Sequence, residues 1–155
     1  MKTATPVPKP LLNGTGRRFA IAASRYNPEV TRKLVNGALD ALAEHGVSLE
    51  DVLVVWVPGA FELPLAAQRL AQTDEVNAIV CVGCIIKGET NHDEVIAYAI
   101  AAGITHVALR TGIPVLLGVV SANNQEQALA RAGGFVNRGR EAALAALEMA
   151  IGGSP

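Results

Sequence analysis

The stretch 82–93, with the sequence VGCIIKGETNHD, carries the densest group of side chains that could do chemistry. An apolar run typical of a buried strand leads without a linker into a glycine, a hydroxyl, an amide and an imidazole, from Gly88, Thr90, Asn91 and His92. In open α/β sheets, ligands bind outside the carboxyl ends of the strands, and the first amides of a following helix favour anions. A histidine in such a place can exchange protons near neutral pH. We therefore predict chemistry on a small, partly anionic molecule.

Three further loops carry groups that suit the same site: Tyr26-Asn27, Ala60-Phe61-Glu62 and the segment 121–124. If the sheet is parallel, the loops that follow its strands gather at one edge. An aromatic face, an amide, a carboxylate and a histidine near a phosphate-like nest would hold a flat, hydrogen-bonding heterocycle with a polar tail.

Each of these side chains also has a purely structural interpretation. Tyr26 could pack against the start of the helix that follows it, and Phe61 at a helix start is more often core than site. Glu62 in a first turn complements the helix dipole, and His92 could bond only to a neighbouring residue. No single residue decides the function, and their shared edge is what favours a site.

Strands and helices alternate along the chain. The predicted strands are 18–24, 52–57, 78–86 and 115–120, and the predicted helices are 28–45, 61–72, 92–111, 125–131 and 138–150. The strands are continuous apolar runs, which indicates a parallel sheet covered on both faces. We therefore predict a three-layer α/β/α sandwich of the flavodoxin-like type, with a central four-stranded parallel sheet, as one domain over residues 17–155. Residues 1–16 are predicted to be extended.

Local signals set the ends of these helices. Asn27 precedes Pro28, so Asn27 is predicted to cap the first helix and Pro28 to occupy its first turn. Gly46 can close that helix in the left-handed conformation. Gly112 and Pro114 are predicted to end the helix over 92–111.

The predicted helix 92–111 is apolar nearly all the way round, which is typical of a buried helix. In a fold whose helices flank the sheet, such a helix is most simply buried against another subunit. The composition agrees, since 50% of the residues are hydrophobic and only 17% are charged. We therefore predict self-association.

Charge and hydropathy exclude several classes of function. The net charge of −1 argues against general binding to nucleic acid or to an anionic membrane, because both need a basic surface. No apolar run approaches the ~18 residues of a membrane span. The start of the chain lacks the apolar core of a secretory signal, so we expect a cytoplasmic protein.

Cys81 and Cys84 form a C-x-x-C pattern, which is compatible with a redox pair or half of a zinc site. Both lie inside an apolar run, where the period of a strand directs them to opposite faces. No second Cys/His pair with zinc-finger spacing follows. Buried structural thiols in a reducing cytoplasm are the favoured interpretation.

Six segments from about Gly14 to Ala150 together resemble the lumazine synthases, a family of riboflavin biosynthesis. They are RRFAIAASRYN (17–27), VVWVPGAFELPLAA (54–67), AIVCVGCIIKGETNHD (78–93), GIPVLLGVV (112–120), EQALARAG (126–133) and NRGREAALAALEMA (137–150). The VPGAFE and GET-x-H blocks, in this order, are highly specific. The resemblance implies condensation of 5-amino-6-(D-ribitylamino)uracil with 3,4-dihydroxy-2-butanone 4-phosphate to 6,7-dimethyl-8-ribityllumazine, with neither metal nor organic cofactor.

The resemblance also implies roles for individual residues. His92 would shuttle protons, and Tyr26 would stack on the pyrimidine at a position that is usually phenylalanine. Glu89 and Thr90 would bind the butanone phosphate, with Arg131 as its counter-charge. The pyrimidine, the ribityl chain and the heterocycle edge would be held by Asn27, Ala60, Phe61, Glu62, Cys84, Ile85 and Ile86.

The resemblance places assembly within catalysis, because Leu117 and Arg131 would come from a neighbouring subunit. Arg138 falls where the family usually has a lysine near the site, although on residue type alone both arginines would be solvated surface charges. Family members form pentamers, decamers and hollow shells of 60 subunits, and the resemblance suggests riboflavin synthase as a partner. We expect at least a pentamer, with the shell as first choice, and an N-terminal segment that adds to a neighbour's sheet.

Three departures from the family pattern bear on activity and assembly. Leu117 stands where most relatives carry phenylalanine, so one wall of the heterocycle site loses its aromatic face. Asp93 replaces the usual aromatic residue after the histidine and adds a carboxylate. The loop 133–138 is one residue shorter than the common form, near the place where pentamers meet.

The sequence is compatible with two alternative functions. One is a lumazine- or flavin-binding or shell-forming relative without catalysis, which the departure at Leu117 favours. The other is a generic flavodoxin-like or receiver-like signalling domain. A receiver needs a cluster of acidic residues at the strand ends, and this chain instead has Ser24, Val57, Ile86 and Val120 there.

Overall fold

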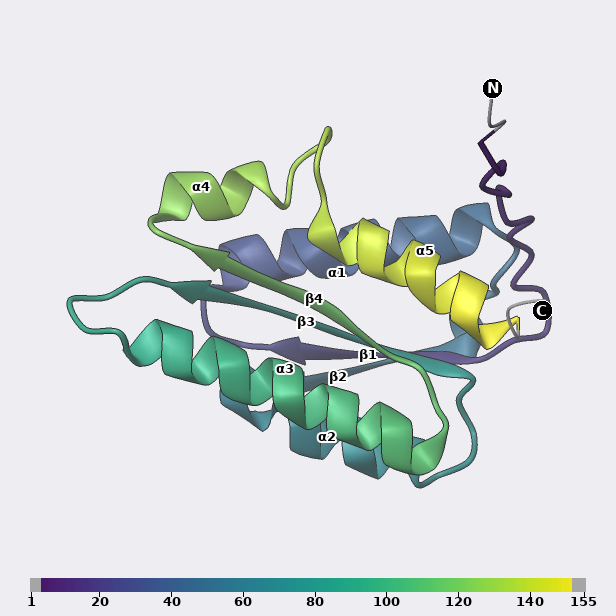
Figure 1. Ribbon diagram of the computed structural model, residues 1–155, viewed down its shortest axis with the longest axis horizontal. Coiled ribbons are helices and arrows are strands. Elements are labelled where there is room, and N and C mark those ends of the chain that lie inside the picture. Colours follow the sequence, from purple (N-terminus) through teal and green to yellow (C-terminus); the bar gives the residue numbers. More distant parts are fainter. Residues whose placement is uncertain (1–3, 152–155) are drawn as a thin grey trace.

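The computed structural model describes residues 4–151 of the chain. Its centre is a four-stranded sheet in the order β2-β1-β3-β4, and every neighbouring pair of strands is parallel. The strands are β1 (Phe19–Ser24), β2 (Val52–Val57), β3 (Ala78–Ile86) and β4 (Val115–Ala122). The predicted parallel sheet is confirmed, and the arrowheads of β1, β3 and β4 point to the same side of the molecule (Figure 1).

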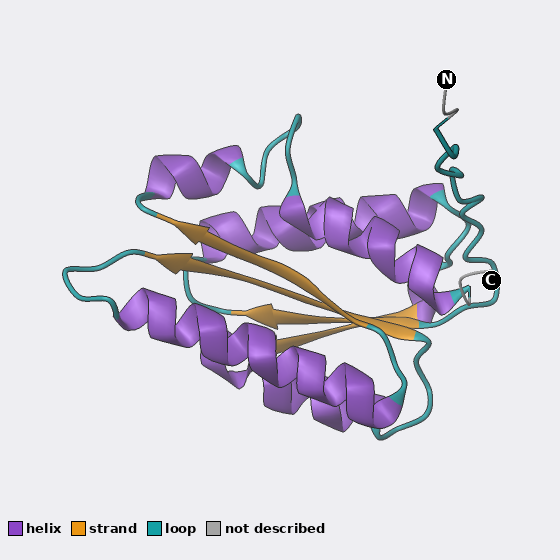
Figure 2. Ribbon diagram, in the orientation of Figure 1, coloured by secondary structure: helices purple, strands orange, loops and turns teal. Residues whose placement is uncertain are grey.

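Helices cover both faces of the sheet, so the predicted three-layer sandwich is confirmed (Figure 2). One face carries α1 (Pro28–Glu44), α4 (Gln125–Ala130) and α5 (Arg138–Ala150), and the other carries α2 (Leu63–Ala71) and α3 (His92–Thr111). Within residues 4–151, no helix combines the length and the apolar character that crossing a membrane requires.

Two apolar cores form because alternate residues of each buried strand point to opposite faces. Phe19 and Ile21 pack on the α1 and α5 side, whereas Ala20 and Ala22 pack on the α2 and α3 side. The two cysteines separate in the same way, with Cys84 in the first core and Cys81 in the second. Both thiols are free and buried, as predicted.

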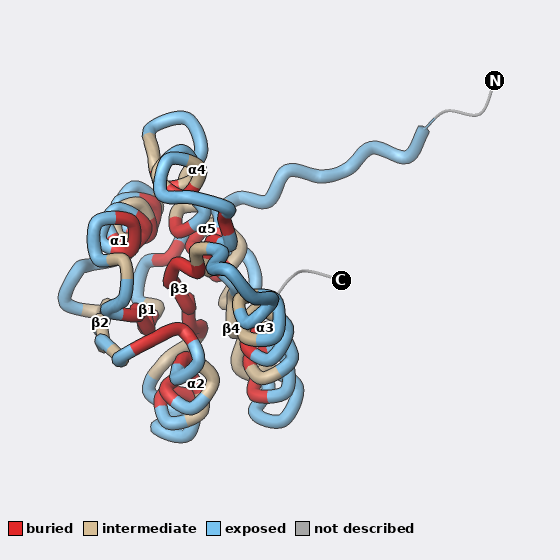
Figure 3. Tube along the Cα trace, turned by 90° about the vertical axis from the view of Figure 1, so that its left-hand side faces the viewer, coloured by how far each residue is buried: buried red, intermediate tan, exposed pale blue. Residues whose placement is uncertain are grey.

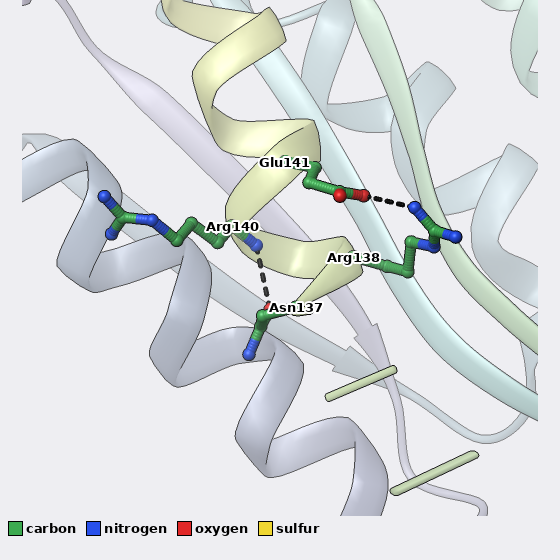
Figure 4. Close-up of polar contacts among 4 residues, drawn as sticks. All are labelled: Asn137, Arg138, Arg140 and Glu141. Carbon is green, nitrogen blue, oxygen red and sulfur yellow. Dashed lines mark hydrogen bonds and ion pairs between the residues drawn. The ribbon is translucent and has the colours of Figure 1, made fainter. Parts of the chain in front are cut away.

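The close packing of α1 against α5 depends on two glycines. A Cβ atom at Gly139 would overlap the main-chain carbonyl of Leu34, and one at Gly37 would overlap the side chain of Asn137. Asn137 caps α5 by accepting a hydrogen bond from Arg140 N at 2.9 Å, as Figure 4 shows. Its amide donates to the carbonyl of Lys33 at 3.0 Å, which ties the start of α5 to α1.

Several predicted ends of elements differ from the structure. α1 ends at Glu44, with Gly46 in the left-handed conformation (φ 87°) as expected, and Gly112 (φ 73°) ends α3 in the same way. The helix predicted from Phe61 begins at Leu63, because Ala60–Glu62 form a single 3-10 turn before it. Pro28 lies in the first turn of α1, but the side chain of Asn27 makes no capping hydrogen bond.

The outer face of α3 carries large apolar side chains that are exposed in the single chain. Ile100, Ile104 and Val107 are buried against the sheet, whereas Tyr98 and Leu109 are 76% and 82% exposed. Figure 3 shows this exposure along the outer side of α3. The helix is therefore not buried on all sides within one subunit.

The N-terminal segment and the outer edge of β2 are also exposed in the single chain. Of the extended segment predicted over 1–16, residues 1–3 lie outside the described residues, and residues 4–13 form neither helix nor strand. Figure 3 shows this segment running away from the domain. β2 is an edge strand whose Leu53 and Trp56 are 53% and 41% exposed.

Candidate active site

A cavity of about 390 Å³ lies at the carboxyl ends of β1, β2 and β3. This is the edge at which the loops were predicted to meet, although residues 121–124 do not line the cavity. The volume lies in the range of small-molecule sites. Its lining contains most of the residues proposed from the sequence: Tyr26, Asn27, Ala60, Phe61, Glu62, Cys84, Ile85, Ile86, Thr90 and His92. Gly88, noted in the sequence as the glycine of this loop, lines it as well, and so do Gly59, Asp93 and Ile96, which were not proposed as site residues.

Two exposed aromatic rings stand at this cavity. The side chains of Tyr26 and Phe61 are 71% and 63% exposed, so neither is buried in the core. The Tyr26 ring lies against Gly59, where an added Cβ would sit 3.0 Å from the ring carbon Cδ2. Gly59 thus allows the ring to approach the backbone, and the open aromatic face suits stacking on a flat ligand.

Glu62 is fixed by the turn that contains it. Its Oε2 accepts a hydrogen bond from the backbone N–H of Gly59 at 3.1 Å. Glu62 N in turn donates to the Gly59 carbonyl at 3.2 Å. The structural interpretation of Glu62 is therefore correct in part, because one carboxylate oxygen holds the turn. A carboxylate accepts several hydrogen bonds, so Glu62 retains capacity for a ligand hydroxyl.

Asn27 links two of the loops that form the cavity. Its backbone adopts the left-handed conformation (φ 55°), and its side-chain amide donates to the carbonyl of Cys84 at 3.0 Å. The side chain therefore reaches across to the end of β3 rather than capping α1, which corrects the prediction made from its position before Pro28. Asparagine tolerates this conformation better than most residues.

His92 is the first residue of α3 and is exposed at the cavity. Its backbone N–H donates to Thr90 Oγ1 at 3.3 Å, so the Thr90 side chain closes the turn that leads into the helix. Within residues 4–151, no ion pair joins the His92 ring to a carboxylate, and Asp93 in particular does not pair with it. Neighbouring residues on a helix point in different directions, which explains the separation.

The remaining residues proposed from the sequence do not line this cavity. Glu89 lies in the loop beside it, and Leu117 is 51% exposed on the edge strand β4. Arg131 Nη1 donates to the Gln127 carbonyl at 2.9 Å, at the end of α4. Arg138 pairs with Glu141 at 2.7 Å on the surface of α5 (Figure 4). One subunit alone therefore does not bring these arginines to the site.

Cys84 lines the cavity, but its thiol packs in the apolar core and is not a reactive nucleophile. Burial raises the pKa of Cys84 to about 11 and that of Cys81 to about 12. Because the thiolate is the reactive form, both thiols are inert near neutral pH. Cys84 contributes its backbone carbonyl and its bulk to the cavity rather than covalent chemistry.

The geometry of the cavity agrees with a comparison against known families. Residues 16–151 match the family model of 6,7-dimethyl-8-ribityllumazine synthase. The chain belongs to the lumazine synthase family. This is a family of riboflavin-biosynthesis enzymes, and the match covers the whole sheet and all of the helices described here.

Membership in the lumazine synthase family excludes the receiver-like signalling domain as an alternative function. The sequence did not single out Ile96, because an apolar helix residue carries no chemical signal. Asp93 was noted only as a departure from the family pattern. Its place in the lining could have been inferred from the spacing of 93 and 96, which puts both on one side of α3.

Proposed function

We propose that the chain condenses 5-amino-6-(D-ribitylamino)uracil with 3,4-dihydroxy-2-butanone 4-phosphate to 6,7-dimethyl-8-ribityllumazine, the penultimate step of riboflavin biosynthesis. The observation that carries the proposal is the cavity itself. In a chain of the lumazine synthase family, it joins the open ring of Tyr26, the anchored carboxylate of Glu62 and the exposed His92.

The lining suits the two substrates in different regions. The Tyr26 ring offers a stacking surface for the pyrimidine, and the backbone of Cys84–Ile86 offers hydrogen-bonding groups to the heterocycle edge. Glu62 would accept hydrogen bonds from ribityl hydroxyls. The turn before α3, with Glu89 and Thr90, would hold the phosphate, because helix amides favour anions.

The reaction needs proton transfers rather than a strong nucleophile from the protein. The amine of the uracil attacks the ketone, and loss of water gives an imine. Phosphate then leaves from the butanone chain, and ring closure releases the second water. His92 would move protons in these steps, for which an imidazole is suited. Holding the two substrates in register would supply a large part of the acceleration.

Assembly would complete the site. Arg131 and Leu117 lie outside the cavity of their own subunit, so the proposal requires them to reach the cavity of a neighbour. A guanidinium matches phosphate oxygens two at a time, which suits Arg131 as the counter-charge, and Arg138 would lie nearby. The apolar outer face of α3 is the surface we assign to subunit contact.

The form of the assembly and its surroundings are part of the same proposal. We infer at least a pentamer, with a shell of 60 subunits favoured, in which the N-terminal segment adds to the edge of a neighbour's sheet. The cytoplasm is the proposed compartment, and riboflavin synthase is a proposed partner inside such a shell.

A single-turnover absorbance assay tests this function. Both substrates are mixed with and without the protein, and lumazine formation is followed, with heat-denatured protein as control. We expect acceleration well above the spontaneous condensation. No acceleration, together with tight binding of a ribityl heterocycle, would instead indicate a binding or shell-forming relative, the alternative that Leu117 favours.

A further inference from the structure

Asp93 carries a polar atom that the described protein leaves unsatisfied. Its Oδ1 is buried, and no hydrogen-bond donor among residues 4–151 reaches it. An ionised carboxylate only accepts hydrogen bonds, and burying it without a donor is costly. Such an atom is rare in a folded protein and calls for an explanation.

The position of Asp93 supplies that explanation. Asp93 lines the proposed active-site cavity together with Ile96, three residues further along α3. Residues at this spacing share one side of a helix, so Asp93 and Ile96 continue the α3 wall of the cavity beyond His92. His92 makes no ion pair with this carboxylate, so Asp93 does not act by holding the histidine.

Two other acceptors that line the cavity already have protein donors. Glu62 Oε2 receives the Gly59 N–H, and the Cys84 carbonyl receives the Asn27 amide. The buried oxygen of Asp93 has no such donor. A ligand that occupies the cavity is therefore the natural source of the missing N–H or O–H group.

We propose that Asp93 is a specificity-determining residue that accepts a hydrogen bond from the donor-rich, uncharged substrate. The inference rests on the proposed function and deepens it. Between the two substrates, the ribitylaminouracil carries amine, ring N–H and hydroxyl donors. The butanone phosphate is anionic, and a carboxylate repels it. Asp93 therefore favours the heterocycle at the part of the wall that it shares with Ile96, and the phosphate stays at the turn that precedes α3.

The proposal also predicts how the removal of Asp93 changes the stability of the ligand-free protein. If only a substrate donor satisfies Oδ1, Asp93 destabilises the ligand-free protein. Removal of its side chain should then not lower the melting temperature. If a protein donor from a neighbouring subunit satisfies it instead, removal should weaken the assembly. The two roles therefore predict opposite changes in stability.

The test compares Asp93→Ala with Glu94→Ala. Glu94 is the exposed neighbour in the same first turn and does not line the cavity, so both variants lose one acidic residue near the helix dipole. We expect Asp93→Ala to raise the dissociation constant for 5-amino-6-ribitylaminouracil, titrated alone, roughly ten- to a hundredfold, as loss of a charged hydrogen bond implies. The KM for the butanone phosphate should stay the same or fall.

The remaining readouts separate the possible failures. We expect the melting temperature of ligand-free Asp93→Ala to equal or exceed that of Glu94→Ala. An unchanged dissociation constant for the uracil, or a lower melting temperature with loss of assembly in sedimentation, would overturn the role of Asp93. Because titration of the uracil needs no turnover, a wild-type protein that binds it but does not accelerate the condensation would sink only the proposed function.

Discussion

His92 combines a fixed backbone with a ring that is open to the cavity. The Thr90 hydroxyl holds its N–H, while the exposed ring carries no ion pair among the described residues. Such a ring can give and take a proton without breaking a structural contact. The backbone of His92 therefore stabilises the turn, whereas the imidazole carries out the proposed proton transfer.

We expect His92→Ala to slow single-turnover lumazine formation roughly ten- to a thousandfold, which lies toward the lower end of what general acid–base catalysis contributes or below it. Because the ring makes no structural ion pair, the melting temperature should change little. His106→Ala is the matched control, since His106 is exposed on the same helix and does not line the cavity. A His92→Ala variant with the full rate would remove the imidazole from the mechanism.

The two buried thiols predict a loss of stability in alkali. Burial raises the pKa of Cys81 to about 12 and that of Cys84 to about 11, from an ordinary value of 9.0. Below pH 9 both states keep their protons, and the effect is absent. Above pH 9 the unfolded chain loses protons that the folded protein retains, so the free energy of unfolding falls toward pH 11–12.

Denaturant titrations at pH 7 and pH 10 measure this effect. The wild-type protein should lose more unfolding free energy between the two pH values than Cys81→Ala does, because the variant lacks the more strongly shifted thiol. Comparing the two differences cancels the contribution of lysines and tyrosines, which titrate in the same range. Equal losses would mean that the Cys81 thiol is not protected from ionisation.

At the scale of elements, α1 and α5 pack so closely that the backbone of one helix contacts the backbone of the other. We expect Gly139→Ala to destabilise the fold by roughly 1–3 kcal/mol or more, because the new Cβ would overlap the Leu34 carbonyl. Gly134→Ala is the control, since a Cβ there meets nothing within 4 Å and should be close to neutral. Urea denaturation of both variants gives the comparison, and equal midpoints would contradict the packing argument.

The sequence predicted the sheet and its helices because each buried strand is a continuous apolar run, bounded by clear turn residues. It predicted the start of α1 at Pro28 correctly but misjudged the role of the residue before it, whose side chain has a distant partner. Asn27 resembles an N-cap in sequence, yet its amide bonds to Cys84, 57 residues away in the chain. Such a contact depends on the tertiary structure, so local preference cannot reveal it.

The candidate site was predictable to the extent that its residues carry chemistry and follow strands. Tyr26, Glu62 and His92 do both, and the structure brings them around one cavity. Ile96 lines the same cavity, but from sequence alone an apolar residue within a helix is interpreted as part of the core. Arg131 was proposed through family resemblance alone, and a single subunit does not place it at the cavity.

At the scale of the whole molecule, the proposed sharing of each site between two subunits predicts that two impaired variants restore activity when they assemble together. His92→Ala and Arg131→Ala should each be impaired as pure assemblies, since each lacks one half of every site. When equal amounts are unfolded and reassembled together, about a quarter of the sites should contain both wild-type residues, as random mixing around a ring implies. Turnover should then rise well above the mean of the two pure variants.

The control for this experiment mixes the two proteins without unfolding them, so that subunits do not exchange. An assembly in which Arg131 serves its own subunit would show no gain on mixing. Sedimentation of the mixed sample confirms that reassembly has occurred and gives the number of subunits.

The edge strand β2 gives this protein a built-in optical reporter. Trp56 is the only tryptophan in the chain, and its side chain lies 41% exposed on that unpaired edge. Its fluorescence should shift to shorter wavelength, and become less accessible to iodide, when another polypeptide segment covers the strand. The emission of the intact protein, compared with a variant lacking residues 1–12, would therefore register that coverage without any added label, and identical spectra would show that the edge stays open to water.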